Sequence, residues 1–131
     1  MKYFTIKELC KSTTATHKGI DNSPNSEIVN NLEQLVENIL DPLRTEYGKP
    51  ININSGYRCE ALNKAVGGSK TSYHRFGLAA DITAGSKSEN KKLFELAQKL
   101  NLPYDQLIDE SNFSWIHISY SKTPRKQILH L

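Results

Sequence analysis

The sequence has little cysteine and no long apolar segment. Its 131 residues include two cysteines, Cys10 and Cys59, which are too few for a disulfide framework, and we expect both to be reduced packing residues. The first residues turn polar at Lys7 and Glu8, which interrupts any signal-peptide core, and no other run could span a bilayer. We therefore expect synthesis in the cytoplasm and no membrane insertion.

Charge of one sign is not concentrated in any segment. The 17 Lys and Arg residues are interleaved with 14 Asp and Glu residues, for a net charge of +3. Because no basic stripe is present, we expect no nucleic-acid partner. The 37% of hydrophobic residues are typical of a globular protein, and the length suits one hydrophobic core. Residues 1–131 are therefore predicted to form a single, monomeric domain with one site.

Apolar spacing predicts helices in the first half of the chain. A short helix is expected at residues 6–11, followed by a turn-rich stretch at 13–26 that contains Gly19 and Pro24. From residue 28 to 43, Ile, Leu and Val recur at steps of three and four, which predicts a long helix with one buried face. Pro42 is expected to kink or re-cap this helix.

The second half of the chain predicts short strands around one more helix. Ser86 and Glu89 are typical of a capping box for a helix that ends before Pro103. Helices first and strands later indicate the α+β class with a small antiparallel sheet. Residues 55–77 are predicted to form a long, polar connection with one helical turn near residues 61–66, and such a loop within a small domain is usually functional. Strands are predicted at residues 51–54, 78–83, 105–109, 115–120 and 127–131.

Two of these predicted strands each carry one polar residue between apolar ones. Alternation places Asp81 opposite Ala80 and Ile82, and it places His117 opposite Ile116 and Ile118. If the strands are neighbours, both side chains lie on one face of the sheet, and His74 can join them from the loop. Two imidazoles and a carboxylate are the protein ligands of a catalytic zinc site, which leaves a fourth position to water.

Each residue also has a simpler interpretation. A single histidine in a strand is more often a packed or surface residue than a metal ligand. Asp81 is harder to explain in that way, because a carboxylate within an apolar strand needs a partner. The spacing alone therefore leaves both interpretations open.

Three spaced motifs favour the metal site. Residues 72–81 match the pattern S-x-H-x-x-G-x-A-x-D, residues 55–58 are SGYR, and residues 115–117 are WIH. In this order they resemble the family of zinc D-Ala-D-Ala carboxypeptidases and cell-wall endopeptidases (peptidase M15), which shares its fold with the hedgehog signalling domain. The opening of the chain, from Phe4 through residues 19–22 to the long predicted helix, resembles the short branch of that family found in phages and bacteria.

The resemblance implies a fold, a cofactor and a substrate. The fold is a small sheet with helices packed on one side, and the zinc ligands are His74, Asp81 and His117. The substrate is a stem peptide of peptidoglycan, cut by a carboxypeptidase or by an endopeptidase of the endolysin type. Such an enzyme, made in the cytoplasm, acts at the cell wall after release. Arg58 and Ser72 are implied near the substrate; Arg58 suits a peptide carboxylate or a developing oxyanion.

The sequence departs from the family pattern at the general base. Many members have an acidic residue three positions before the last histidine, where this chain has Ser114. The resemblance to the short branch implies a Glu at the end of the strand before this position, so we expect Glu110 to take this role, with Asp109 as the second candidate. A carboxylate near the reacting water can move its proton. The departure leaves two alternatives: a non-catalytic zinc-containing module that binds cell wall or a partner protein, and a hedgehog-like domain with structural zinc.

Overall fold

The computed structural model describes residues 1–131. The predicted helices and strands are all present, and one short helix and one 3-10 turn were not expected. The helical segments are α1 (Ile6–Cys10), α2 (Thr13–Lys18), α3 (Ser26–Leu35), the π turn η1 (Val36–Leu40), α4 (Asp41–Tyr47), α5 (Glu60–Ala65), the 3-10 turn η2 (Tyr73–Phe76) and α6 (Lys87–Lys99). The strands are β1 (Asn52–Ser55), β2 (Ala79–Thr83), β3 (Tyr104–Glu110), β4 (Trp115–Tyr120) and β5 (Gln127–His130).

The long predicted helix is continuous through α3, η1 and α4. A π turn precedes Pro42, and the Asp41 N–H donates to the Val36 carbonyl. A proline has no N–H for the helical ladder, and its ring collides with the carbonyl one turn earlier. A widened turn accommodates such a break without ending the helix. The helix ends at Gly48, which has a positive φ of 75°.

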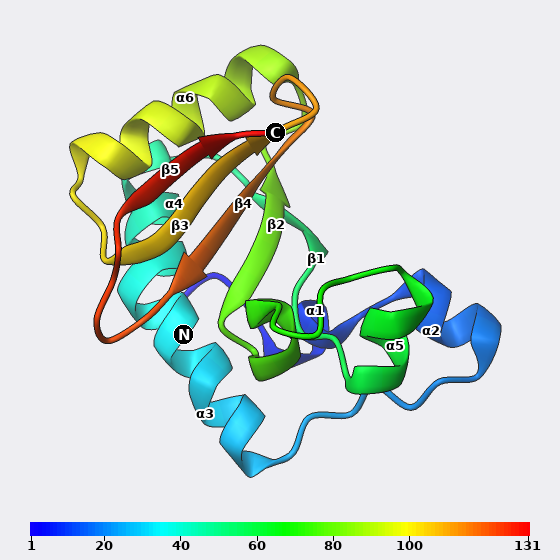
Figure 1. Ribbon diagram of the computed structural model, residues 1–131. Helices are drawn as coiled ribbons and strands as arrows, with labels where there is room; N and C mark the ends of the chain where they lie inside the picture. The colour runs from blue at the N-terminus through cyan, green and yellow to red at the C-terminus, as the bar shows by residue number, and fades with distance from the viewer.

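The five strands form one sheet in the order β1-β2-β4-β3-β5. The first three pairings are antiparallel, and their register places Asp81 directly opposite His117. Strand β5 pairs parallel to β3, so the sheet is not entirely antiparallel as expected. The parallel direction follows from the connection after β4, which returns past β3 before β5 begins (Figure 1).

The sheet has one apolar face and one polar face. Helices α3, α4 and α6 cover the apolar face, whereas α1, α2 and α5 gather near one end of β1 and β2 (Figure 1). The apolar face contributes fully buried residues such as Ile82, Leu107 and Ile116, which pack in one core with the helix residues Leu35 and Leu93. The α+β prediction with helices on one side of a small sheet is confirmed. No helix has the length and apolar character needed to cross a membrane.

Two local predictions were wrong. The stretch at residues 13–26 contains α2, which begins where the Ser12 side chain caps the helix and ends at Gly19 in the left-handed conformation. Short helices of this kind have no long apolar pattern to reveal them. The capping box at α6 is only half formed: Ser86 accepts from the Glu89 N–H, but the Glu89 carboxylate bonds to Lys49 instead.

Candidate metal centre

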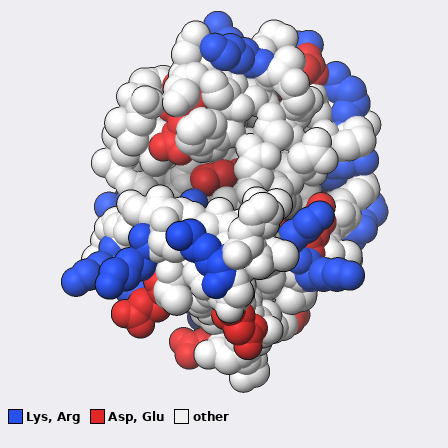
Figure 2. All heavy atoms as spheres, turned by 90° about the vertical axis from the view of Figure 1, so that its right-hand side faces the viewer, with Lys and Arg blue, Asp and Glu red and all other residues white.

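The polar face of the sheet carries a cavity of about 490 Å³. Asp81 and His117 lie on its floor as an opposed pair of β2 and β4. Figure 2 shows this face of the molecule, with acidic atoms at the bottom of a hollow and several Lys and Arg side chains on the rim below it. The strand alternation predicted from the sequence therefore brings both side chains to one face.

His74 reaches the same point from η2. Its ring is buried, with 2% of the residue exposed, and its Nδ1 lies 2.7 Å from the Gly56 carbonyl. Because a carbonyl only accepts, Nδ1 carries a proton and donates to it, and in the neutral ring the lone pair is on Nε2. This nitrogen lies 3.3 Å from Asp81 Oδ1, so the Gly56 carbonyl both orients the ring and selects the nitrogen that can bind a metal.

The three predicted ligands form one compact group. His117 Nδ1 lies 3.0 Å from Asp81 Oδ1, and the ligand atoms of His74, Asp81 and His117 all lie within 4.8 Å of one another. Ligands bound tetrahedrally at about 2.1 Å are roughly 3.4 Å apart, so these distances need little adjustment. Two imidazole nitrogens and one carboxylate oxygen fit zinc, and these are the residues that would hold it.

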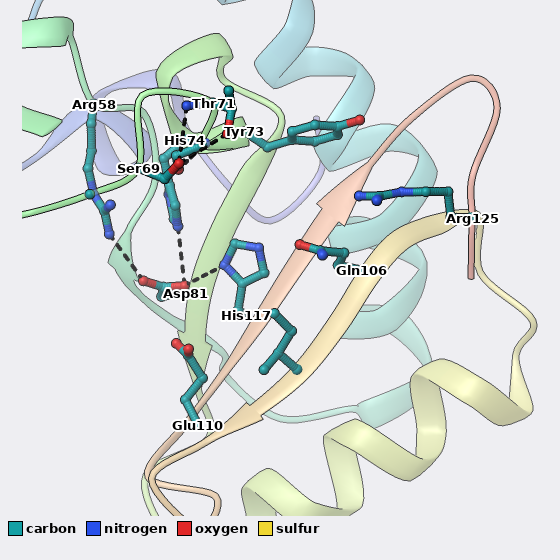
Figure 3. Close-up of a pocket in the computed structure, with 13 residues that line it drawn as sticks. Arg58, Ser69, Thr71, Tyr73, His74, Asp81, Gln106, Glu110, His117 and Arg125 are labelled. Carbon is teal, nitrogen blue, oxygen red and sulfur yellow. Dashed lines mark hydrogen bonds and ion pairs between the residues drawn. The ribbon is translucent and has the colours of Figure 1, made fainter. Parts of the chain in front are cut away.

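The Asp81 carboxyl is surrounded by positive and donating groups. Burial alone raises the pKa of Asp81, but the hydrogen bonds that His117 and His74 donate, and their positive charge when protonated, outweigh burial, so the pKa lies well below its usual value. Arg58 adds a contact of 3.4 Å from Nη2 to Asp81 Oδ2. Asp81 is therefore ionised at neutral pH, as a metal ligand must be. Figure 3 shows the carboxylate between Arg58, His74 and His117.

Arg58 lies on the wall of the cavity and is fixed there by its neighbours. Besides the contact with Asp81, its Nε donates to Ser55 Oγ at 3.0 Å and its Nη1 donates to Asn63 Oδ1 at 3.4 Å. A guanidinium has five N–H donors, so these three contacts leave two for a ligand. Ser72 also lines the cavity, where its Oγ accepts from the His74 N–H at 3.2 Å. Ser72 thus begins the turn that carries His74.

Glu110 and Asp109 point to opposite faces of β3. Glu110 lines the cavity, and its Oε2 accepts from Trp115 Nε1 at 2.6 Å. In Figure 3 its carboxylate rises from the end of β3 toward Asp81. Asp109 is buried, forms an ion pair with His130 and does not line the cavity. Of the two acids considered, Glu110 alone can reach a ligand bound at the three residues.

The turn between β3 and β4 explains why Ser114 is not part of the cavity. Residues 111–113 all have left-handed backbone conformations, with φ of 48°, 54° and 63°. Ser114 Oγ donates to the Ser111 carbonyl at 2.7 Å, so this side chain closes the turn. The buried Asn90 amide donates to the carbonyls of Phe113 and Ser114. This turn holds Glu110 beside Trp115 at the edge of the cavity.

Gln106 and Arg125 are among the lining residues that were not predicted from the sequence. Gln106 is two and four residues from Ile108 and Glu110, so strand alternation could have placed all three on the cavity side. Arg125 lies beyond β4, and its guanidinium is paired with the buried Asp105 at 2.7 Å. No sequence motif indicates Arg125, because its position depends on the return of the chain toward β5.

The loop that carries Arg58 is braced by the amino-terminal part of the chain. The Tyr57 N–H donates to the Leu9 carbonyl at 2.8 Å. Asn22 donates from Nδ2 to the carbonyls of Cys10 and Tyr57, and its Oδ1 accepts from the Cys59 N–H. The amide of Asn22 therefore holds the backbone on both sides of Arg58.

Gly56 sits where this loop touches α1. A Cβ atom on Gly56 would lie 2.2 Å from the Leu9 carbonyl oxygen, a distance that real side chains do not tolerate. Only glycine permits this close approach of two backbone segments. The same residue presents the carbonyl that orients His74. The brace from α1 therefore acts on the metal centre as well as on Arg58.

We expect Asn22→Ala to weaken both the fold and the metal centre. The substitution leaves two carbonyls and one N–H of this brace without partners, which costs roughly 1–3 kcal/mol of unfolding free energy. Because the loop also supports His74, affinity for a divalent ion should fall. Urea unfolding and metal titration test this, with the exposed Asn52→Ala as a control that should change stability by less than about 0.5 kcal/mol. If Asn22→Ala and Asn52→Ala have the same unfolding free energy and the same metal affinity, Asn22 does not support the loop.

Comparison with known proteins agrees with the motifs. The sequence matches the family model described as Peptidase M15 over residues 2–119. The zinc D-Ala-D-Ala carboxypeptidase of Streptomyces albus G is 49% identical over 39 residues, which are 30% of this chain and 15% of that protein. The matched segment is thus a small part of both proteins. Because the family match covers nearly the whole chain, this protein belongs to the peptidase M15 family.

Proposed function

We propose that the protein is a zinc-dependent peptidase that hydrolyses stem peptides of peptidoglycan. The observation that carries this proposal is the convergence of His74, Asp81 and His117 in one cavity with Glu110 and Arg58. The matched segment of the Streptomyces carboxypeptidase supports the metal and the class of substrate. Zinc held by these ligands would polarise the carbonyl to be cut and lower the pKa of water.

Glu110 supplies the proton transfers in this proposal. Trp115 Nε1 holds Oε2 at 2.6 Å, which fixes the carboxylate and leaves Oε1 to act. Oε1 takes a proton from the attacking water and then delivers it to the nitrogen of the leaving amine. A general acid–base group that is already oriented needs no rearrangement before the reaction. The acidic residue missing at position 114 is thus replaced by one from the neighbouring strand.

Arg58 orients the substrate and meets negative charge. Its two remaining N–H donors lie on the cavity wall beside Asp81. In a carboxypeptidase they would bind the terminal carboxylate, and in either mode they would stabilise the oxyanion that develops on the attacked carbonyl. Ser72 lies next to this region, and its hydroxyl hydrogen is available to a substrate oxygen because its oxygen accepts from the His74 N–H.

Two further questions are which peptide bond of the stem peptide is cut and where the protein acts. Both carboxypeptidase and endopeptidase action are compatible with a cavity that is open on one face of the molecule (Figure 2). We propose that the protein acts at the cell wall after release from the cell in which it is made.

Digestion of purified peptidoglycan tests the function directly. We expect the zinc-loaded protein to change the muropeptide profile measured by mass spectrometry, and a chelator to prevent the change. Loss of one terminal residue from stem peptides identifies a carboxypeptidase, whereas conversion of cross-linked dimers to monomers identifies an endopeptidase. An unchanged profile with the zinc-loaded protein would contradict the proposal.

A further inference from the structure

A second cavity of about 290 Å³ adjoins the candidate metal centre. It lies between α3 and the end of β4, and Tyr73 lines both cavities. In Figure 3 the Tyr73 ring extends from the turn that carries His74 toward the helices behind the sheet. The two cavities therefore meet at Tyr73, and a peptide that occupied both would pass round this residue.

The spacing along the strands relates the two cavities to the length of a peptide. Asp81 faces His117, and three residues away the Tyr120 N–H donates to the Leu78 carbonyl at 2.8 Å. Leu78 and Tyr120 both line the second cavity. Three residues of a strand span about 10 Å, and an extended substrate rises by a similar amount per residue. A bond placed at His117 is therefore at least about three residues from the second cavity, which lies beyond the ends of β2 and β4 on the α3 side of the sheet.

The lining of the second cavity has one charge and many hydrogen-bonding groups. Gln34 is three and four residues from Asn31 and Asn30, so it is a neighbour of both on the surface of α3. Amide side chains of this kind both donate and accept, as a peptide backbone requires. Lys122 is the one charged side chain of the lining. It forms no ion pair with any acidic residue of the chain.

We propose that this cavity is a subsite for the peptide substrate about three residues from the bond that is cut, and that Lys122 binds a carboxylate there. The inference rests on the proposed function and adds a charge preference to it. In the carboxypeptidase mode the substrate continues only on the amino side of the bond, and we place the subsite on that side. The favoured substrate is thus an extended peptide with an acidic group at that distance.

Paired synthetic peptides and paired variants test this subsite. The peptides contain the bond identified in the peptidoglycan digest and carry D-glutamate or D-glutamine three residues to its amino side. We expect the wild type to cleave the glutamate peptide with a kcat/KM about two- to fivefold higher, the range of an exposed ion pair. Lys122→Met should remove this preference, and Lys122→Glu should reverse it.

A variant that fills the second cavity is expected to change kcat/KM more than the Lys122 variants do. Asn30 is exposed on α3, so Asn30→Trp should fold normally and block the subsite. We expect it to lower kcat/KM at least about tenfold for the long peptides while a peptide truncated before the third residue is cleaved as by the wild type. Glu37→Trp, an exposed substitution on the same helix outside this cavity, should leave both lengths unaffected.

The outcomes separate this inference from the function on which it rests. An unchanged glutamate preference in Lys122→Met, or an equal loss for long and truncated peptides in Asn30→Trp, overturns the subsite while peptide hydrolysis stands. If the wild type cleaves neither length, the proposed function fails and the subsite fails with it.

Discussion

Replacing His117 by alanine is expected to abolish both zinc binding and peptide hydrolysis. The substitution removes one of three converging ligand atoms and leaves Asp81 Oδ1 without its contact at 3.0 Å. Residues that only orient metal ligands already change affinity or activity by about 10- to 100-fold, so loss of a ligand should exceed that range. Zinc content after dialysis and muropeptide hydrolysis measure the two effects.

A second histidine variant shows whether the effect of His117→Ala comes from the metal site or from a loss of folding. His17 is exposed at the end of α2, away from the cavity, so His17→Ala should keep zinc and activity. Circular dichroism should show the same secondary structure in both variants, because His117 projects from the polar face and not into the core. Retention of zinc and full hydrolysis by His117→Ala would remove the basis of the proposed function.

Replacing Glu110 by glutamine is expected to lower the rate while zinc stays bound. Glutamine keeps the size of the side chain and an oxygen for Trp115 Nε1, but it cannot take a proton from water at neutral pH. General acid–base groups contribute about 10²- to 10⁴-fold to rates, and we expect a loss of kcat in that range. Steady-state kinetics and zinc analysis of the same preparation measure the two quantities.

Asp109 provides the control for this experiment. It is the neighbouring acid in the sequence, but it lies on the other face of β3 and pairs with His130. Asp109→Asn should therefore lower stability and leave kcat nearly unchanged. If Glu110→Gln keeps the wild-type rate, Glu110 is not the base. If the wild type binds zinc but does not hydrolyse the peptide, the non-catalytic alternatives are favoured.

The sequence was sufficient to predict the residues that converge on the metal centre. Alternation in two short strands placed Asp81 and His117 on polar faces, and the antiparallel register of β2 and β4 brings them opposite each other. The family resemblance added His74, Arg58 and Glu110. Period-two patterns with one polar position are informative because a half-buried strand has only two faces.

The groups that support the site could not be predicted in the same way. Asn22 and Gly56 act through backbone contacts with residues distant in the sequence, and such contacts produce no periodic pattern. Arg125 reaches the cavity only because β5 returns parallel to β3. The 3-10 turn at Tyr73–Phe76 is too short for periodicity to reveal, although it determines where His74 points.

The left-handed turn at residues 111–113 indicates where greater heat resistance could be obtained. Residues other than glycine and asparagine enter this conformation at a cost of roughly 1–2 kcal/mol each, and two of the three are Ser111 and Phe113. Phe113 contacts Phe94 with ring centroids 5.5 Å apart, so replacing Phe113 by glycine would remove this aromatic contact. Ser111 contributes only its carbonyl to the turn, and glycine would retain that group without the steric penalty. A search for a longer-lived form of the enzyme should therefore begin at position 111.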